Sequence, residues 1–235
     1  MRIHAFLVAA ALLAAPVTAA DRNFGVSGFD RVRLDGDYRV TLTTGIAPFA
    51  KASGDRRAID NLSMRVEGRT LVVRSGQSGN WGGYAGAQNG PITISIGTHD
   101  LTAAQVNGGG SLAINRVEGL KFDASAMGAG ALAIDDVAVD QFSVVLAGAA
   151  SARLAGKVGK LTALVRGTAV LDGEALNAKD STIVAEGPAV VRLTATETAK
   201  VTAAGVGSVS LSGQPSCTLT LRGSASVTGC KERAR

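Results

Sequence analysis

The side chains best suited to chemistry are few in this sequence. Beyond the first twenty residues there is a single histidine, His99, and the two cysteines are Cys217 and Cys230. A serine hydrolase needs a positioned nucleophile beside a histidine, but no nucleophile-elbow motif accompanies His99. Zinc needs clustered histidine, cysteine or acidic ligands, which this spacing does not supply. The sequence therefore predicts no catalytic residue, no metal site and no cofactor.

Carboxylates offer a second kind of chemistry, because glycosidic cleavage uses a pair of acids about 5–10 Å apart. The outward-facing acids to weigh for this role are Asp172, Glu174 and Glu186. Sugar sites also tend to present aromatic platforms, yet no aromatic residue follows Phe142. We expect Asp172 and Glu174 to lie in a turn, and a β-helical polysaccharide-degrading enzyme is kept as the alternative function.

Two aromatic residues stand apart from the rest of the pattern. Residues 75–90 are rich in glycine, serine and asparagine, which predicts an insertion loop. This loop holds the only tryptophan, Trp81, and one of the two tyrosines, Tyr84. Exposed aromatic side chains are good binding anchors, so these two are the predicted binding residues. The competing interpretation is that they fold back and cover an apolar end of the fold.

The elements that must position these side chains are indicated by an internal repeat centred on glycine. Successive register glycines are separated by 20, 20, 19, 20, 18 and 18 residues. The register glycines are Gly108, Gly128, Gly148, Gly167, Gly187, Gly205 and Gly223. We expect each of them to occupy a tight corner, where a Cβ atom would clash or where φ is positive.

Apolar residues alternate with more polar ones on both sides of each register glycine. The positions two and four before it and four after it are apolar in every copy, and the position two after it never exceeds alanine. A period of two predicts half-buried strands. Because the same positions are apolar in every repeat, we expect equivalent residues of successive repeats to stack on one another. The sequence thus predicts an all-β solenoid with coils of 18–20 residues, seven of which fill residues 101–235. A β-sandwich of hairpins is the alternative.

The N-terminal part, residues 21–100, has the same pattern less regularly. Apolar residues flank Gly36 and Gly68 in the same columns. Residues 55–61 predict a short helical turn, and residues 92–96 an alternating strand. We expect either earlier coils interrupted by insertions or a β-cap, because an exposed solenoid end templates aggregation.

Composition and charge narrow the class of protein. The chain is 46% hydrophobic but only 4% aromatic, so it builds its core from small aliphatic side chains and is not disordered. Residues 1–20 predict a secretory signal peptide, since a short basic start precedes an apolar run too brief to span a membrane. Its removal takes away one arginine and no acid, which leaves a net charge of +4. These charges are scattered, which excludes a nucleic-acid-binding surface.

The secretory signal also bears on location and on the cysteines. We expect the mature chain to be periplasmic or extracellular, with no transmembrane segment. Disulfides form in such oxidising compartments, so Cys217 and Cys230 are predicted to pair and to tie down the C-terminal segment.

Several stretches resemble a known family. They are Phe29–Val32, Val40–Leu42, Arg69–Val73, Ile92–Ile96 and the glycine-centred repeats such as Asn107–Ser111. Over nearly the whole mature chain the sequence is similar to the family called putative auto-transporter adhesin, head GIN domain. The resemblance implies a right-handed, parallel β-helix-like domain in the bacterial envelope or outside the cell. It implies no catalytic residues.

Together these observations predict a secreted, non-catalytic interaction module of the bacterial cell envelope. Its repeats would present a long, flat surface that binds an extended partner through many weak contacts. The expected partner is an envelope polysaccharide or another envelope protein. A further hypothesis is an assembly element that stacks end to end, with the Cys217–Cys230 pair as its terminator.

Overall fold

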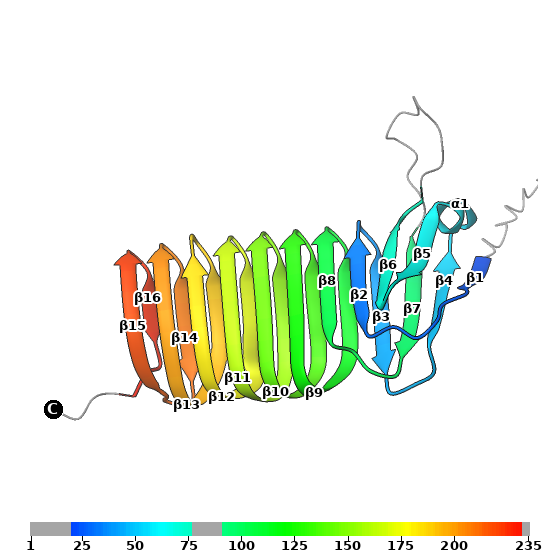
Figure 1. The fold of residues 1–235 in the computed structure, drawn as a ribbon. Helices are drawn as coiled ribbons and strands as arrows, with labels where there is room; N and C mark the ends of the chain where they lie inside the picture. The colour runs from blue at the N-terminus through cyan, green and yellow to red at the C-terminus, as the bar shows by residue number, and fades with distance from the viewer. Residues whose placement is uncertain (1–19, 77–90, 232–235) are drawn as a thin grey trace, which may run out of the picture.

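The structure, a computed structural model, describes residues 20–76 and 91–231. Figure 1 shows an elongated stack of strands that succeed one another along a single axis. All strands join one sheet, whose order begins at β1 and ends at β16. The predicted all-β solenoid of stacked parallel coils is confirmed, with an irregular N-terminal part. Among the described residues, no helix is long and apolar enough to cross a membrane.

The regular part of the solenoid runs from β8 to β16. Long strands that each extend from one corner to the next form its middle, and the last turn is divided into shorter strands. The bounds are β8 Ala103–Gly108, β9 Ser111–Gly128, β10 Ala131–Gly148, β11 Ser151–Gly167, β12 Val170–Glu186, β13 Val190–Gly205, β14 Ser208–Ser212, β15 Ser216–Gly223 and β16 Ser226–Thr228.

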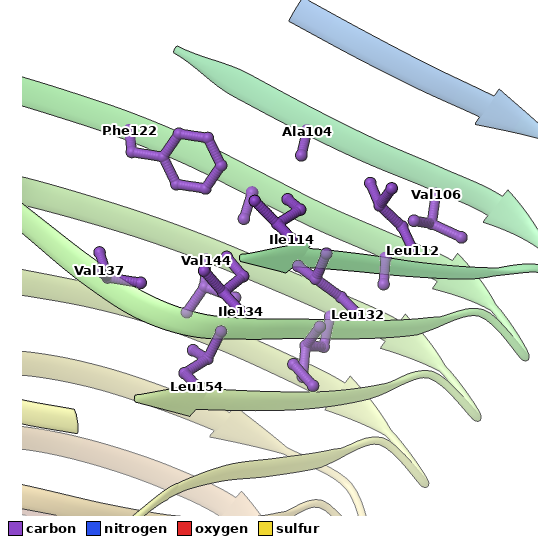
Figure 2. Close-up of a cluster of buried hydrophobic side chains, with 14 of the residues drawn as sticks. Ala104, Val106, Leu112, Ile114, Phe122, Leu132, Ile134, Val137, Val144 and Leu154 are labelled. Atoms are coloured by element: carbon purple, nitrogen blue, oxygen red, sulfur yellow. The ribbon is translucent and has the colours of Figure 1, made fainter. Parts of the chain in front are cut away.

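The parallel register stacks equivalent residues of successive turns on one another. Leu132 of β10 lies opposite Leu112 of β9 on one side and Ala152 of β11 on the other. All three are at most 3% exposed. Figure 2 shows Leu112, Leu132 and neighbouring side chains directed into the space between the strands. Apolar burial drives this arrangement, because each inward column continues through the stack without a break.

The register glycines form the predicted corners. Gly148 has φ of 85°, in the left-handed region that favours glycine. A Cβ atom added there would lie 2.8 Å from the carbonyl oxygen of Gly128 in the turn below. The small residue two positions later, Ala150, is 1% exposed and fits the same tight approach. The repeat predicted seven coils, but seven corners bound only about six turns of solenoid.

The N-terminal part contains eight further elements. They are β1 Ala20–Phe24, β2 Arg31–Asp35, β3 Arg39–Thr44, β4 Phe49–Gly54, α1 Arg56–Asp60, β5 Leu62–Glu67, β6 Thr70–Ser75 and β7 Ile92–Thr98. The predicted strand at residues 92–96 is confirmed as β7. The predicted helical turn is α1, where the Asp55 carboxylate caps the N-terminus by accepting a hydrogen bond from the Ala58 N–H.

Both structures expected for the N-terminal part occur together. β2 and β3 pair parallel with β8 and β9, so they form an earlier turn with Gly36 at its corner. β6 and β7 pair parallel with the opposite edges of β2 and β3 and extend the stack outward. Beyond them the pairing becomes antiparallel, where β5 joins β6, β4 joins β7 and β1 joins β4. These last strands are the cap.

The placement of Gly68 in the repeat columns is wrong. Gly68 lies in the hairpin between β5 and β6, whose antiparallel register pairs Glu67 with Thr70. Its φ of 63° is typical of such a turn. Hairpin strands and solenoid strands alternate with the same period, so the apolar residues near Gly68 did not distinguish them.

Candidate functional site

The predicted binding residues Trp81 and Tyr84 lie outside the described residues. The described chain on either side fixes where this insertion enters the fold. Arg74 of β6 lies opposite Asp35, and Thr93 of β7 lies opposite Arg39. β6 therefore ends, and β7 begins, beside the corner that Gly36 makes in the adjacent turn.

The predicted disulfide is present. Cys217 lies in β15 and Cys230 comes after β16, with their Cα atoms 5.7 Å apart. Cys217 pairs in register with Ala199, which is buried, so the bridge stands in an interior column of the last turn. The Lys231 N–H also donates a hydrogen bond of 3.0 Å to the Pro215 carbonyl. The bridge closes the final turn covalently.

The last turn leaves interior side chains uncovered. We call β15 and β16 the C-terminal edge. Leu219 and Leu221 of β15 are 43% and 46% exposed, whereas their register partners Val201 and Ala203 are at most 1% exposed. The apolar columns predicted from the sequence therefore continue into the last turn, but within the described residues no further turn covers them.

Of the three acids weighed for glycosidic cleavage, Glu186 lies apart from Asp172 and Glu174. Asp172 and Glu174 lie two residues apart within β12, and not in the turn that the sequence predicted. Glu186 lies at the other end of β12. Glu186 forms an ion pair of 2.9 Å with Arg166, and Glu174 approaches Arg192 at 3.9 Å. Glu186 and Glu174 thus each face an arginine of a neighbouring strand on the outer surface.

His99 lies in a bend just after β7, beside a polar cluster that the sequence did not reveal. We call this cluster the clamp; its centre is Asp30, which is 8% exposed. The Asp30 carboxylate accepts hydrogen bonds of 3.0 and 2.6 Å from the Arg69 guanidinium and one of 3.1 Å from the Thr102 hydroxyl. The Asp30 carbonyl accepts the Thr102 N–H at 2.7 Å.

The clamp holds three neighbouring turns together. Asp30 precedes β2, Arg69 precedes β6 and Thr102 precedes β8, and β2 lies between the other two strands. A hollow of about 450 Å³ lies beside it, bounded also by His99 and Glu118. The signal in the sequence was the pair of family motifs at Phe29–Val32 and Arg69–Val73, which contain the two ionic partners.

A second hollow opens at the capped end. This N-terminal mouth has a volume of about 630 Å³, and its lining residues include Arg22, Arg65, Arg74, one acid, Asp60, and the apolar Phe24 and Met64. The Arg22 guanidinium carbon lies 4.8 Å from the centre of the Phe24 ring, within the range of a cation–π contact. The mouth therefore combines positive charge with partly apolar walls.

One carboxylate beside the mouth has a shifted pKa. A hydrogen bond from the Lys51 ammonium is the main cause that lowers the pKa of Asp21, and Ser53 contributes a second hydrogen bond. The Lys51 Nζ lies 2.7 Å from the Asp21 carboxylate. The pair therefore stabilises the folded state at pH values above the ordinary pKa of aspartate. This stabilisation is lost as the pH falls through the lowered pKa of Asp21. Asp21 is exposed, so the effect is small.

The flat outer surface carries an apolar strip. Val145, Leu164 and Val184 are register partners on three successive turns, and each alternates with buried neighbours so that its side chain faces outward. We call these three residues the outer strip. Ser125 and Thr202 continue the same column at its two ends.

Across residues 20–76 and 91–231, no group of three or more histidine, cysteine or acidic side chains could hold a metal ion.

Known structures have the same architecture. An adhesin from Bacteroides fragilis, described as putative, matches with a TM-score of 0.77 and 18% identity over 91% of this chain and 96% of that one. A putative lipid binding protein from Parabacteroides distasonis matches with a TM-score of 0.66 and 17% identity over 90% and 96%. A putative adhesin from Parabacteroides merdae gives 0.67 and 13% over the same shares. These identities establish the fold alone.

Sequence comparison gives the family. No curated protein matches the chain. A family model described as putative auto-transporter adhesin, head GIN domain, matches residues 28–215. This range contains the clamp, the early turns and nearly all of the regular solenoid, and it agrees with the resemblance in the sequence motifs. The chain therefore belongs to the putative auto-transporter adhesin, head GIN domain family.

Proposed function

We propose that this chain is a secreted, non-catalytic module that binds an extended component of the bacterial cell envelope along its flat outer surface. The outer strip is the observation that carries the proposal. Val145, Leu164 and Val184 face outward from three successive turns, where β-strands of a solenoid otherwise present polar side chains. Membership of an adhesin-named family supports the same function.

The physical basis is the repetition of one contact along the axis. Adjacent strands lie about 4.8 Å apart, so the strip offers equivalent apolar contacts at that interval. Polar side chains flank it, including Thr162 and Thr182 on one side and the Arg166–Glu186 ion pair on the other. An extended polysaccharide or protein segment would place successive groups against the strip and add many small contributions.

The first prediction concerns the outer strip. Changing Leu164 or Val184 to arginine should weaken binding to insoluble cell-wall polysaccharide about tenfold, because a charged side chain replaces a central apolar contact. Co-sedimentation measures the affinity. The matched control is Val190→Arg, since Val190 also faces outward with a similar partial exposure, but on the other side of the corner.

The control decides how the result is interpreted. Equal losses in Val190→Arg and Leu164→Arg would contradict a specific role for the strip. Release of reducing sugar from the polysaccharide during the assay would favour the alternative function, a polysaccharide-degrading enzyme. If isolated envelope proteins bind and the polysaccharide does not, the partner class changes to protein while the strip is tested in the same way.

Trp81 and Tyr84 remain the predicted aromatic anchors of this module. Their joint replacement by alanine forms a second arm of the same experiment. Weaker binding at an unchanged melting temperature would support their role as anchors. Unchanged binding with a lower melting temperature would support the competing interpretation, in which they cover an apolar part of the fold.

A second candidate function is recognition of an acidic lipid headgroup at the N-terminal mouth. Three arginines and the Phe24 ring line this hollow, and guanidinium groups bind phosphate and carboxylate in bidentate fashion. The solved Parabacteroides distasonis neighbour is itself named as a putative lipid binding protein.

The second prediction tests this candidate with a charge reversal. Arg65→Glu should reduce co-sedimentation with vesicles of an anionic phospholipid about tenfold, and vesicles of a zwitterionic lipid should not bind either protein. Arg153→Glu on the outer surface makes the same change in net charge away from the mouth. If both variants lose binding equally, the attraction is a property of net charge and the mouth is not a lipid site.

A further inference from the structure

The two ends of the solenoid are built differently. At the N-terminal end, antiparallel strands close the stack, and the outermost strands β1 and β5 carry charged residues such as Asp21, Arg22 and Arg65. Charges on an edge strand are a common protection against pairing with another chain. Helix α1 adds further cover, because it contacts β1 and β4. This end is unsuited to further strand addition.

The C-terminal edge lacks this protection within its strands. β15 pairs only with β13 and β16 only with β14 among the described strands, so each has one open side. Arg222 is the one charged residue in either strand, and neither strand contains a proline. Leu219 and Leu221 are 43% and 46% exposed in positions that are buried in the turns below. An open, apolar edge with a single charge is a template for pairing.

The disulfide restrains the two ends of the C-terminal edge. A terminal strand with an open side ordinarily frays, because half of its backbone hydrogen bonds are missing. Cys217 at the start of β15 is joined to Cys230 beyond β16, so both ends of the last turn are held together. The edge is therefore a preorganised surface, and preorganisation lowers the entropic penalty of association.

We infer that the C-terminal edge is an interface between two copies of this chain, joined end to end by antiparallel pairing of their β15 strands. The two-fold arrangement uses the same surface of both copies, so the assembly closes at a dimer. Head-to-tail stacking would have to use the capped N-terminal end, whose edge strands are charged. The inference is independent of the ligand proposed for the outer surface.

The sequence of β15 is complementary to itself in this arrangement. With Thr220 on the two-fold axis, Leu219 of one copy lies opposite Leu221 of the other, and the reverse pair forms as well. Directly opposed side chains of an antiparallel pair point to the same face, so four leucines would meet inside the joint. Arg222 falls opposite Thr218, so no like charges are opposed. The core would then continue from one copy into the next.

The third prediction is a dimer that forms in solution. Sedimentation velocity of the oxidised full chain should show a monomer at low concentration and a dimer at high concentration, with dissociation in the micromolar range typical of small interfaces. Replacing both Leu219 and Leu221 with glutamate should leave a monomer at every concentration. The matched control is Leu120→Glu, because Leu120 is 78% exposed in β9 and far along the chain from the edge; this variant should dimerise like the unmodified chain.

A cysteine pair tests the register. Opposed Cα atoms on an antiparallel pair lie about 4.5–5.5 Å apart, which permits a disulfide. Thr220→Cys should therefore form a covalent dimer on oxidation, whereas Thr218→Cys, which faces Arg222 of the other copy, should do so much more slowly. A monomer at all concentrations, an open series of larger oligomers, or equal cross-linking of the two cysteine variants would overturn the inference.

Discussion

Replacing Gly167 with alanine is expected to lower the free energy of unfolding by about 3 kcal/mol. Gly167 has φ of 80°, a conformation that costs a residue with a side chain about 1–2 kcal/mol. The added Cβ would also lie 2.7 Å from the carbonyl oxygen of Gly148 and 3.3 Å from its Cα. Backbone atoms of the turn below cannot move aside without disturbing the parallel register, so the clash adds to the conformational term.

The chain offers a control that separates these two terms. Gly45 has φ of 78°, nearly the same as Gly167, but a Cβ added to Gly45 would meet nothing within 4 Å. Gly45→Ala should therefore show the conformational term alone, about 1 kcal/mol. Chemical denaturation of both variants measures the difference. Equal losses would mean that positive φ, and not close stacking of corners, explains the recurrence of glycine in this repeat.

The regular solenoid could be predicted from the sequence because one physical cause repeats. Each corner requires a glycine such as Gly148, and each turn places apolar residues on the same inward columns. Because every turn has these same requirements, glycine and apolar residues recur at a fixed spacing, and the strands and corners could be placed from the sequence alone. The disulfide could be predicted from chemistry as well, because only two cysteines are present to pair.

The N-terminal part could not be predicted in the same way, because its pairings are not periodic. The chain enters the stack at β2, moves outward through β4, β5, β6 and β7, and returns inward to β8 on the far side of β2. Nothing local in the sequence marks this return. The clamp fixes it, since Asp30, Arg69 and Thr102 come from segments that only the fold brings together.

The C-terminal edge shows why a column of apolar residues is not by itself a buried core. Leu219 and Leu221 fit the inward columns as well as any earlier pair, but burial also needs a turn above them. The sequence specifies the direction of each side chain, whereas its exposure depends on whether another turn of the solenoid lies against it. The residues that point to an association surface were for this reason indistinguishable from core residues until the last turn was placed.

The widest side chains of the solenoid interior share one column. Phe122 and Phe142 are register partners with their ring centres 5.6 Å apart, and both are at most 1% exposed. Along the axis the side chains of this column then become smaller, in the order Leu161, Ser181 and Ala199. The low aromatic content of the chain therefore does not mean that rings fit poorly. In this column the rings are confined to two adjacent strands, β9 and β10, and smaller side chains follow toward Cys217.

Shortening the side chain of Phe142 should show how rigid this interior is. Phe142→Ala removes a ring that contacts the turns on both sides, so the free energy of unfolding should fall by about 4 kcal/mol through lost burial and the cavity left behind. Phe142→Leu is the matched control, because the next turn already carries Leu161 in this column, and we expect a loss of about 1 kcal/mol. Chemical denaturation with a hydrogen-exchange map of β9 to β11 measures both. Similar losses in the two variants would mean that the turns close over the cavity, and the stacked backbone would then be softer than its continuous parallel pairing indicates.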